Sequence, residues 1–216
     1  MAKIKQGILG GFSGKVANVV GTSWKGRAVM KSQPLSVANP KTEAQQEQRG
    51  KFSAVAELAS KILTQFVQPV ENPISGDISG YNLFCKDNKS AFDAVGALVV
   101  ANLVCGGGKI ENLAANSIGV SDNAQDLDVN WTKTGDESAV RLTDKVYAAI
   151  IGVDKDYIYV NNGSETRNDE TAQCTKISGA DTYAASDKVA VLYACVSADG
   201  RDVSIKTNAK EVTLSF

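Results

Sequence analysis

The chain has 216 residues, of which 43% are hydrophobic and 22% charged, with 19 Gly, 4 Pro and a formal net charge of −1. This composition is typical of a globular protein and excludes a disordered or collagen-like chain. The longest apolar stretch is too short to span a bilayer, and no apolar core of a secretory signal follows the first lysines, so we expect a cytoplasmic protein or a component of a virion or other released particle.

The charge is distributed unevenly along the chain. Residues 1–51 hold nine basic and two acidic residues, whereas residues 110–216 hold ten basic and seventeen acidic ones. The net charge of a segment influences which partners it binds and not how it folds. The basic amino-terminal part is therefore the feature of the sequence that is most informative about function.

The first elements that we expect are two short strands. A glycine-rich segment, residues 7–15, should be mobile unless a partner or the core holds it. The β-branched runs Val16–Val20 and Arg27–Lys31 flank the glycine-bounded segment Gly21–Gly26, which predicts a hairpin with Trp24 in its loop.

Two helices should follow the hairpin. Thr42 and Gln45 have the spacing of a capping box, and apolar residues then recur at three- and four-residue steps to about Val67. The apolar set of this helix is Phe52, Val55, Leu58, Ile62, Leu63 and Phe66. Pro69 and Pro73 should end the helix. A second helix is expected over residues 80–94, with Val95 in its apolar set, and an αα-hairpin is the economical arrangement.

The triple glycine Gly106–Gly108 predicts a junction between two domains, residues 1–108 and 109–216. A strand is expected just before it, over residues 98–105. Strands are expected beyond it at 114–120, 126–132, 145–153, 157–160, 171–177, 188–197, 202–207 and 211–216. The almost wholly apolar runs at 145–151 and 188–196 suit central strands, whereas the alternation in Leu127–Trp131 suits a half-buried one. We therefore expect an α+β protein whose second domain is an immunoglobulin-like or fibronectin-type antiparallel β-sandwich.

Several segments resemble a known family. The segments are Gly7 to Val16, Val19-Val20-Gly21, Trp24-Lys25-Gly26, Asn39 to Thr42 with Gln45, Arg49 to Phe52, and Ser197 to Ser204. They resemble an uncharacterised Bacteroidota family, domain-of-unknown-function family 6266. The spacing of Thr42, Gln45, Arg49 and Phe52 is also similar to that in small phage and prophage proteins. Neither resemblance implies a known activity.

Enzymatic function is disfavoured by the residues that the chain lacks. It has no histidine, which removes the commonest general base and metal ligand. The Gly-Lys pairs at 14–15 and 108–109 lack the first glycine and the final hydroxyl of a phosphate loop. The four cysteines stand in no CxxC pair, so reduced, partly buried thiols are expected, with a bridge between Cys174 and Cys195 as the lesser alternative. We expect no enzyme, no cofactor and no metal.

The candidate partner-binding residues are Lys15, Trp24, Lys25, Arg27, Lys31 and Arg49. Three interpretations remain open for them. In the first, Trp24 fills a core between hairpin and helix. In the second, the cations dock on an acidic protein surface, including that of a neighbouring copy. In the third, they contact phosphates while Trp24 stacks on a base.

The leading hypothesis is a non-enzymatic structural or assembly protein, such as a component of a phage-like particle, that associates with itself or with another protein. The alternative is a nucleic-acid-binding protein that uses the hairpin around Trp24. A carbohydrate-binding sandwich ranks last, because Tyr157, Tyr159 and Tyr183 are the few aromatic residues of its loops. No membrane insertion and no small-molecule substrate are expected.

Overall fold

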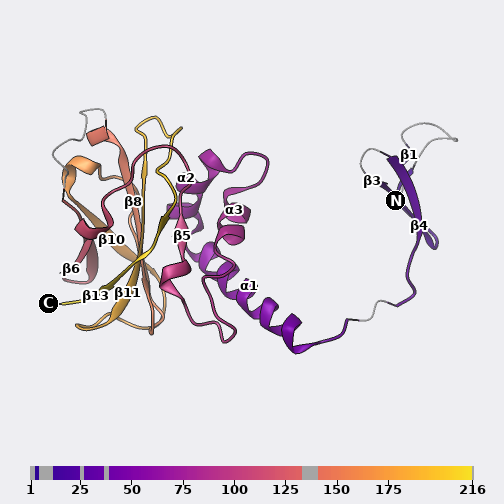
Figure 1. Ribbon diagram of the computed structural model, residues 1–216, viewed down its shortest axis with the longest axis horizontal. Helices are drawn as coiled ribbons and strands as arrows, with labels where there is room; N and C mark the ends of the chain where they lie inside the picture. The colour runs from indigo at the N-terminus through magenta and orange to yellow at the C-terminus, as the bar shows by residue number, and fades with distance from the viewer. Residues whose placement is uncertain (1–2, 5–11, 25–26, 37–38, 133–140, 216) are drawn as a thin grey trace. The chain divides into compact units, whose positions relative to one another are not determined.

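The structure is a computed structural model that describes residues 3–4, 12–24, 27–36, 39–132 and 141–215 (Figure 1). The chain divides into two compact units, residues 1–42 and 43–216. The boundary expected at the triple glycine falls inside the second unit, and residues on both sides of it share one hydrophobic core.

The first unit is a four-stranded antiparallel sheet in the order β1-β2-β3-β4. Its strands are β1 (Lys3–Ile4), β2 (Phe12–Val16), β3 (Val19–Trp24) and β4 (Arg27–Ser32). The prediction of two strands in a hairpin is correct for β3 and β4, but the expected loop over residues 21–26 is wrong, because residues 21–24 continue β3. Val16 belongs to a separate strand, which turns into β3 at Ala17 and Asn18.

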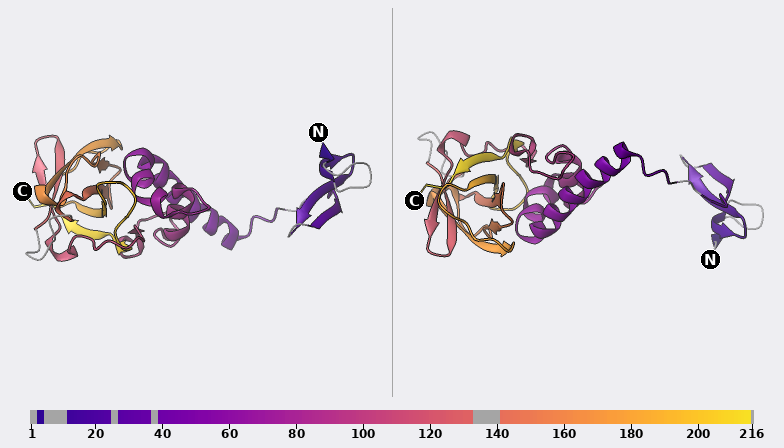
Figure 2. Two further views of the ribbon diagram at one scale, coloured as in Figure 1. Left: turned by 90° about the horizontal axis from the view of Figure 1, so that it is seen from above. Right: turned by 90° about the horizontal axis from the view of Figure 1, so that it is seen from below.

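The second unit begins with helices that pack on one face of a large sheet (Figure 2). They are α1 (Glu43–Lys61), α2 (Gln68–Glu71) and α3 (Gly80–Asp87), with a π-helical turn over Leu63–Val67 and a 3-10 turn over Asn72–Ile74. The first buried apolar residue of α1 is Val55. Phe52, expected on the buried face, is 59% exposed, and most residues in the first turns of α1 are exposed as well.

The helix does not end at the first proline. Pro69 lies in the first turn of α2, where its missing N–H is not needed for the helical ladder. The second helix is shorter than expected and ends at Asp87, because the Asn88 side chain donates to the Phe84 carbonyl and turns the chain away. Val95 therefore lies outside the helix, in a turn, where it is 91% exposed.

Short elements connect the helices to the sheet. The expected strand over residues 98–105 is a 3-10 turn, Val100–Asn102, followed by β5 (Val104–Cys105), which pairs with β12 (Thr207–Asn208). Further 3-10 turns lie at Ala115–Ser117, Arg141–Thr143 and Arg167–Asp169, the first where a strand was expected.

Seven strands form one antiparallel sheet in the order β13-β11-β8-β9-β10-β7-β6. Their bounds are β6 (Gly119–Asn123), β7 (Asp126–Asn130), β8 (Lys145–Gly152), β9 (Ile158–Val160), β10 (Thr171–Ser178), β11 (Lys188–Val196) and β13 (Lys210–Thr213). The sheet curls until it nearly closes, since the Lys210 ammonium of the edge strand β13 donates to the Ile118 carbonyl, one residue before β6, at 2.6 Å.

Both faces of the central strands β8 and β11 are buried. Ala149 and Leu192 face the helices, whereas Ala148 and Val191 face a second core enclosed by the curled sheet. This two-sided burial confirms the interpretation of their apolar runs, and Leu127 and Val129 of β7 confirm the half-buried alternation.

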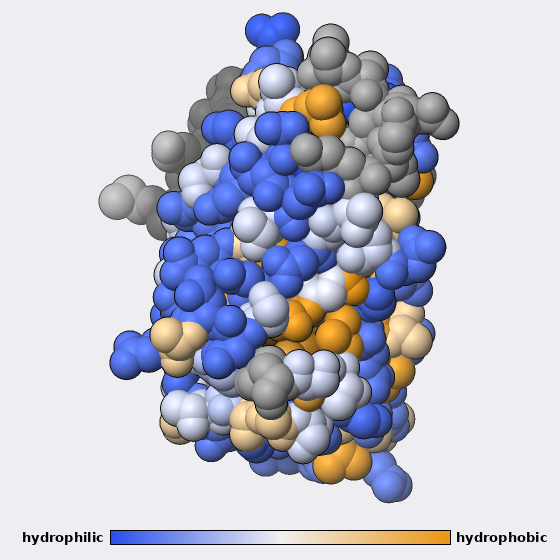
Figure 3. All heavy atoms as spheres, turned by 90° about the vertical axis from the view of Figure 1, so that its left-hand side faces the viewer, coloured by the Kyte–Doolittle hydropathy of each residue, from blue (hydrophilic) through white to orange (hydrophobic). Residues whose placement is uncertain are grey.

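The protein is thus a mixed α+β protein dominated by antiparallel sheets. On the side away from the helices the surface is mostly hydrophilic, with apolar residues near the centre and at several places along the edges (Figure 3). Among the described residues, no helix has the length and hydropathy needed to cross a membrane.

Candidate functional site

The first unit has two chemically different faces because neighbouring residues of a strand project to opposite sides. In the register of the sheet, Val20 of β3 lies between Lys15 of β2 and Lys31 of β4. Residues directly opposite one another in a sheet share a face. By the same alternation, Arg27 lies on the face of Lys31. We name the face carrying Lys15, Val20, Thr22, Arg27, Val29 and Lys31 the cationic face.

A tight turn fixes this arrangement. Val16 pairs with Val19, so β2 and β3 are joined by the two residues Ala17 and Asn18. Ala17 has a positive φ of 48°, and the Asn18 carbonyl accepts from the Gln33 amide at 2.8 Å. Since a hairpin turn determines the register of its strands, this turn is what places Lys15 beside Val20.

The cations of this face have no local counter-charge. Residues 1–42 hold six lysines and one arginine and no acidic residue, a net charge of +7. Lys15, Arg27 and Lys31 are exposed, and none of the three takes part in an ion pair with a residue that the structure describes. Their charge therefore acts outward, on whatever approaches the face.

Two expected site residues are placed only in part. Trp24 ends β3, and its backbone is in register with Arg27, so its expected place in a loop is wrong. Its side chain lies outside the described residues, as does the whole of Lys25.

Arg49 is separate from the other candidates. It lies on the exposed part of α1, in the second unit, where it lines a shallow groove with Gln48, Phe52, Ser53 and Ala56. The structure therefore groups Lys15, Arg27 and Lys31, and does not group Arg49 with them.

Sequence reasoning missed the opposite side of the sheet. This apolar face carries Phe12, Gly14, Val16, Val19, Gly21, Ser23, Ala28, Met30 and Ser32, which alternate with the residues of the cationic face. Val16 is 53% and Met30 70% exposed. The alternation of apolar with basic residues in β2 and β4 is the signal that would have found it, had the turn at Ala17 been recognised.

The four cysteines lie in the interior of the second unit. Cys85, Cys105, Cys174 and Cys195 are all buried and unbridged, as the prediction of reduced thiols requires. Burial raises the pKa of the Cys105 thiol to about 12, and it also raises the pKa values of Cys85 and Cys174. Nucleophilic cysteines need the opposite shift. Among the described residues, no three acidic, cysteine or histidine side chains gather as a metal site would require.

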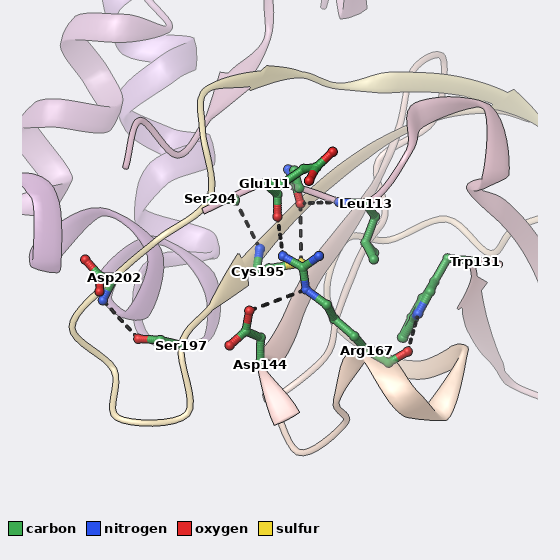
Figure 4. Close-up of polar contacts among 10 residues, drawn as sticks. Glu111, Leu113, Trp131, Asp144, Arg167, Cys195, Ser197, Asp202 and Ser204 are labelled. Atoms are coloured by element: carbon green, nitrogen blue, oxygen red, sulfur yellow. Dashed lines mark hydrogen bonds and ion pairs between the residues drawn. The ribbon is translucent and has the colours of Figure 1, made fainter. Parts of the chain in front are cut away.

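The most polar part of the interior is structural (Figure 4). Arg167 is 2% exposed, and its guanidinium lies 3.5 Å from the Asp144 carboxylate and donates to the Glu111 carbonyl. The Trp131 indole donates to the Arg167 carbonyl at 3.0 Å. These contacts join the segment before β6, the end of β7 and the turns that flank β8 and β10.

The three tyrosines considered for sugar binding do not form an exposed surface in loops. Tyr157 and Tyr159 are each 1% exposed and pack edge to face in the core inside the curled sheet, and only Tyr183 is partly exposed. Two of the three rings named for the carbohydrate alternative are therefore inaccessible to a sugar.

Comparison with known families places the chain in a family. The model of a family of unknown function, DUF6266, matches residues 11–208. The chain belongs to this family. No curated protein and no solved structure matches it. The match to the family includes the whole of β2, β3 and β4, so the two-faced sheet lies within the part of the chain that defines membership.

Proposed function

We propose that the protein is a non-enzymatic structural or assembly protein whose cationic face contacts an acidic surface of a neighbouring subunit. The observation that carries this proposal is the register that sets Lys15 and Lys31 on either side of Val20, with Arg27 on the same face. A phage-like or other self-assembling particle is the setting that such a subunit suits.

Charge complementarity makes a second copy the natural neighbour. The first unit has a net charge of +7, whereas residues 43–216 hold sixteen basic and twenty-four acidic residues, a net charge of −8. Opposite charge steers association and fixes its orientation. Contacts between unlike surfaces of identical subunits produce rings or filaments.

The proposal is tested by light scattering coupled to size-exclusion chromatography. Wild-type protein should associate at about 50 mM salt and dissociate at about 500 mM, because screening shortens the range of exposed charges. The triple variant Lys15→Ala/Arg27→Ala/Lys31→Ala should stay monomeric at low salt.

The control removes the same charge elsewhere. Lys109, Lys145 and Arg201 are exposed cations of the second unit, and their triple alanine variant should associate as the wild type does. Equal loss of association in both variants would show that net charge alone matters and would overturn the role given to the cationic face.

A nucleic-acid-binding protein is the second candidate, favoured by the same grouping of cations without local carboxylates. Phosphate contacts predict an affinity for single-stranded nucleic acid that falls steeply with salt. In a gel-shift titration, the triple variant of the cationic face should lose binding and the control triple variant should keep it. Absence of any shift for the wild type at low salt would remove this candidate.

The fold part of the proposal concerns residues 109–216, for which we infer an immunoglobulin-like or fibronectin-type arrangement. Short antiparallel strands around a shared core support it. A sandwich has two separate sheets, whereas here the hydrogen bonding is continuous from β13 to β6. An experimental structure of this region tests the inference by the number of sheets that it contains.

A further inference from the structure

One carboxyl group of the second unit is buried where the helices meet the triple glycine. Glu71, the last residue of α2, is 2% exposed, and its Oε1 accepts from the Gly106 amide at 3.1 Å. Its Oε2 is also buried and has no hydrogen-bond partner among the described residues. A buried carboxyl group with an unpartnered oxygen is tolerated when it is protonated and is costly when it is ionised. Glu71 is therefore a group whose charge the surrounding structure must answer.

An ion pair between two distant segments lies beside this carboxyl group. The Lys206 ammonium, shortly before β12, donates to the Asp87 carboxylate at the end of α3 at 2.5 Å. A Cβ atom added to Gly107 would lie 3.8 Å from Cε of Lys206, so the lysine stem passes next to the residue whose amide binds Glu71. Two carboxyl groups thus share the neighbourhood of one ammonium.

Both members of the ion pair act on Glu71. Burial is the main cause of its raised pKa of about 7, the negative charge of Asp87 raises the pKa further, and the positive charge of Lys206 lowers it. These signs are those of two carboxylates that compete for one cation.

The other described elements around α2 supply no charge at this point. Cys105 of β5 is a buried thiol whose pKa is raised to about 12, so it is neutral. The π-helical turn before α2 and the 3-10 turn after it contain no ionisable residue. The side of β11 that faces the helices is apolar. Lys206 is therefore the cation that is placed to compensate an ionised Glu71.

We propose that Glu71 is a proton switch which, on ionisation, draws the Lys206 ammonium away from Asp87 and so releases the end of α3. While Glu71 is protonated, Lys206 joins α3 to the segment before β12. Once Glu71 is ionised, its buried charge attracts the same ammonium more strongly, because charges interact more strongly where water is excluded. The Lys206 side chain is 46% exposed, so packing does not hold its ammonium in one place.

The direction of the switch follows from the two states of Glu71. Its pKa in the folded protein lies above the ordinary value of 4.5, so the folded protein keeps the proton below about pH 7 and loses it above. The ion pair with Asp87 is therefore intact in acid and broken in mild alkali.

NMR titration of lysine-labelled protein between about pH 5.5 and pH 8.5 tests the exchange of partners. The Cε signal of Lys206, assigned by its loss in Lys206→Arg, should shift in the wild type with a midpoint near pH 7. In Glu71→Gln it should stay constant. Lys188, which pairs with Glu211 on the surface, is the control and should stay constant in both proteins.

A second signal tests the switch in the wild type alone, without relying on a variant. The carboxyl carbon of Asp87 should shift with the same midpoint as Lys206, because Asp87 loses its ammonium at that point. A Lys206 signal that is constant over the whole range would overturn the proposal. So would a shift of equal size in Glu71→Gln, or a shift of Lys206 that Asp87 does not follow.

Discussion

The ring of Phe12 lies over the backbone of Gly21 on the neighbouring strand. A Cβ atom at residue 21 would lie 2.6 Å from Cδ2 and 2.7 Å from Cε2 of that ring, inside van der Waals contact. An aromatic ring placed over a strand glycine shields backbone that no side chain covers. Gly21 is the only described residue of the first unit that is buried, so this pair is the most closely packed point of its sheet.

Replacement of Gly21 by alanine should therefore loosen the first unit. The added methyl would meet the Phe12 backbone carbonyl as well as its ring, so β2 itself must shift, and overpacking of this kind costs about 1–3 kcal/mol. Amide hydrogen exchange should accelerate across β2, β3 and β4 while the second unit keeps its protection. Ser23→Ala, an exposed position on the same face of β3, serves as the control and should leave exchange unchanged.

Glu71 should make the stability of the second unit depend on pH. It is 2% exposed, one oxygen accepts from the Gly106 amide, and burial raises its pKa to about 7. Since an unfolded glutamate ionises near pH 4.5, the folded state holds the proton over a window in which the unfolded state has lost it. Stability is greatest below that window and falls as the pH rises through about 7, by up to roughly 3 kcal/mol.

Glu71→Gln should flatten that pH dependence. In urea unfolding, the variant should match the wild type at pH 4 and exceed it at pH 8, since it buries no charge. Glu211→Gln, at a surface position paired with Lys188, should unfold as the wild type does at both values. A wild type that is equally stable at pH 4 and pH 8 would contradict the assignment.

Asn88 should be essential for the junction between α3 and β5. It is 1% exposed, donates to the Phe84 and Val104 carbonyls at 3.0 and 2.9 Å, and accepts from the Val104 amide at 2.7 Å. Asn88→Ala removes the side-chain partner of the Val104 amide and carbonyl, and the loss of each such hydrogen bond costs about 1–3 kcal/mol. Thermal unfolding should show a clear loss, whereas the exposed Asn102→Ala should stay within about 0.5 kcal/mol of the wild type.

The Arg167 and Asp144 pair should show strong coupling. Asp144 is 4% exposed, so Arg167→Met would leave a buried carboxylate without its cation, at a cost of about 3–5 kcal/mol. The double variant Arg167→Met/Asp144→Leu should recover part of that loss, because it removes both charges. A double-mutant cycle by urea unfolding measures the coupling, and additive losses would count against the pair.

The sequence predicts the sheet of the second unit better than any other part. Its central strands are buried on both faces, so nearly all of their residues are apolar or small. Such runs can be recognised as strands in the sequence. The helical region was harder, because its ends depend on interactions that no local pattern shows. Pro69 is compatible with a new helical start, and Asn88 ends α3 by bonding to a strand that is distant in sequence.

The amino-acid composition of residues 1–42 indicates a cationic site, but the sequence does not predict how its residues are arranged. A surplus of cations was visible, but their common face depends on a turn at Ala17, where alanine adopts a positive φ that sequence rules reserve for glycine and asparagine. A sequence interpretation that misplaces this turn puts Trp24 in a loop and overlooks the apolar face. Arg49 looked close in the sequence but belongs to the other unit.

The ionisable side chains of the first unit are all basic. Residues 1–42 contain lysine and arginine but no histidine, cysteine, tyrosine, aspartate or glutamate. Within residues 1–42 no carboxylate can neutralise these cations. Dissolved ions screen them from an acidic partner, so ionic strength is the variable by which the surroundings of the sheet can regulate its contacts.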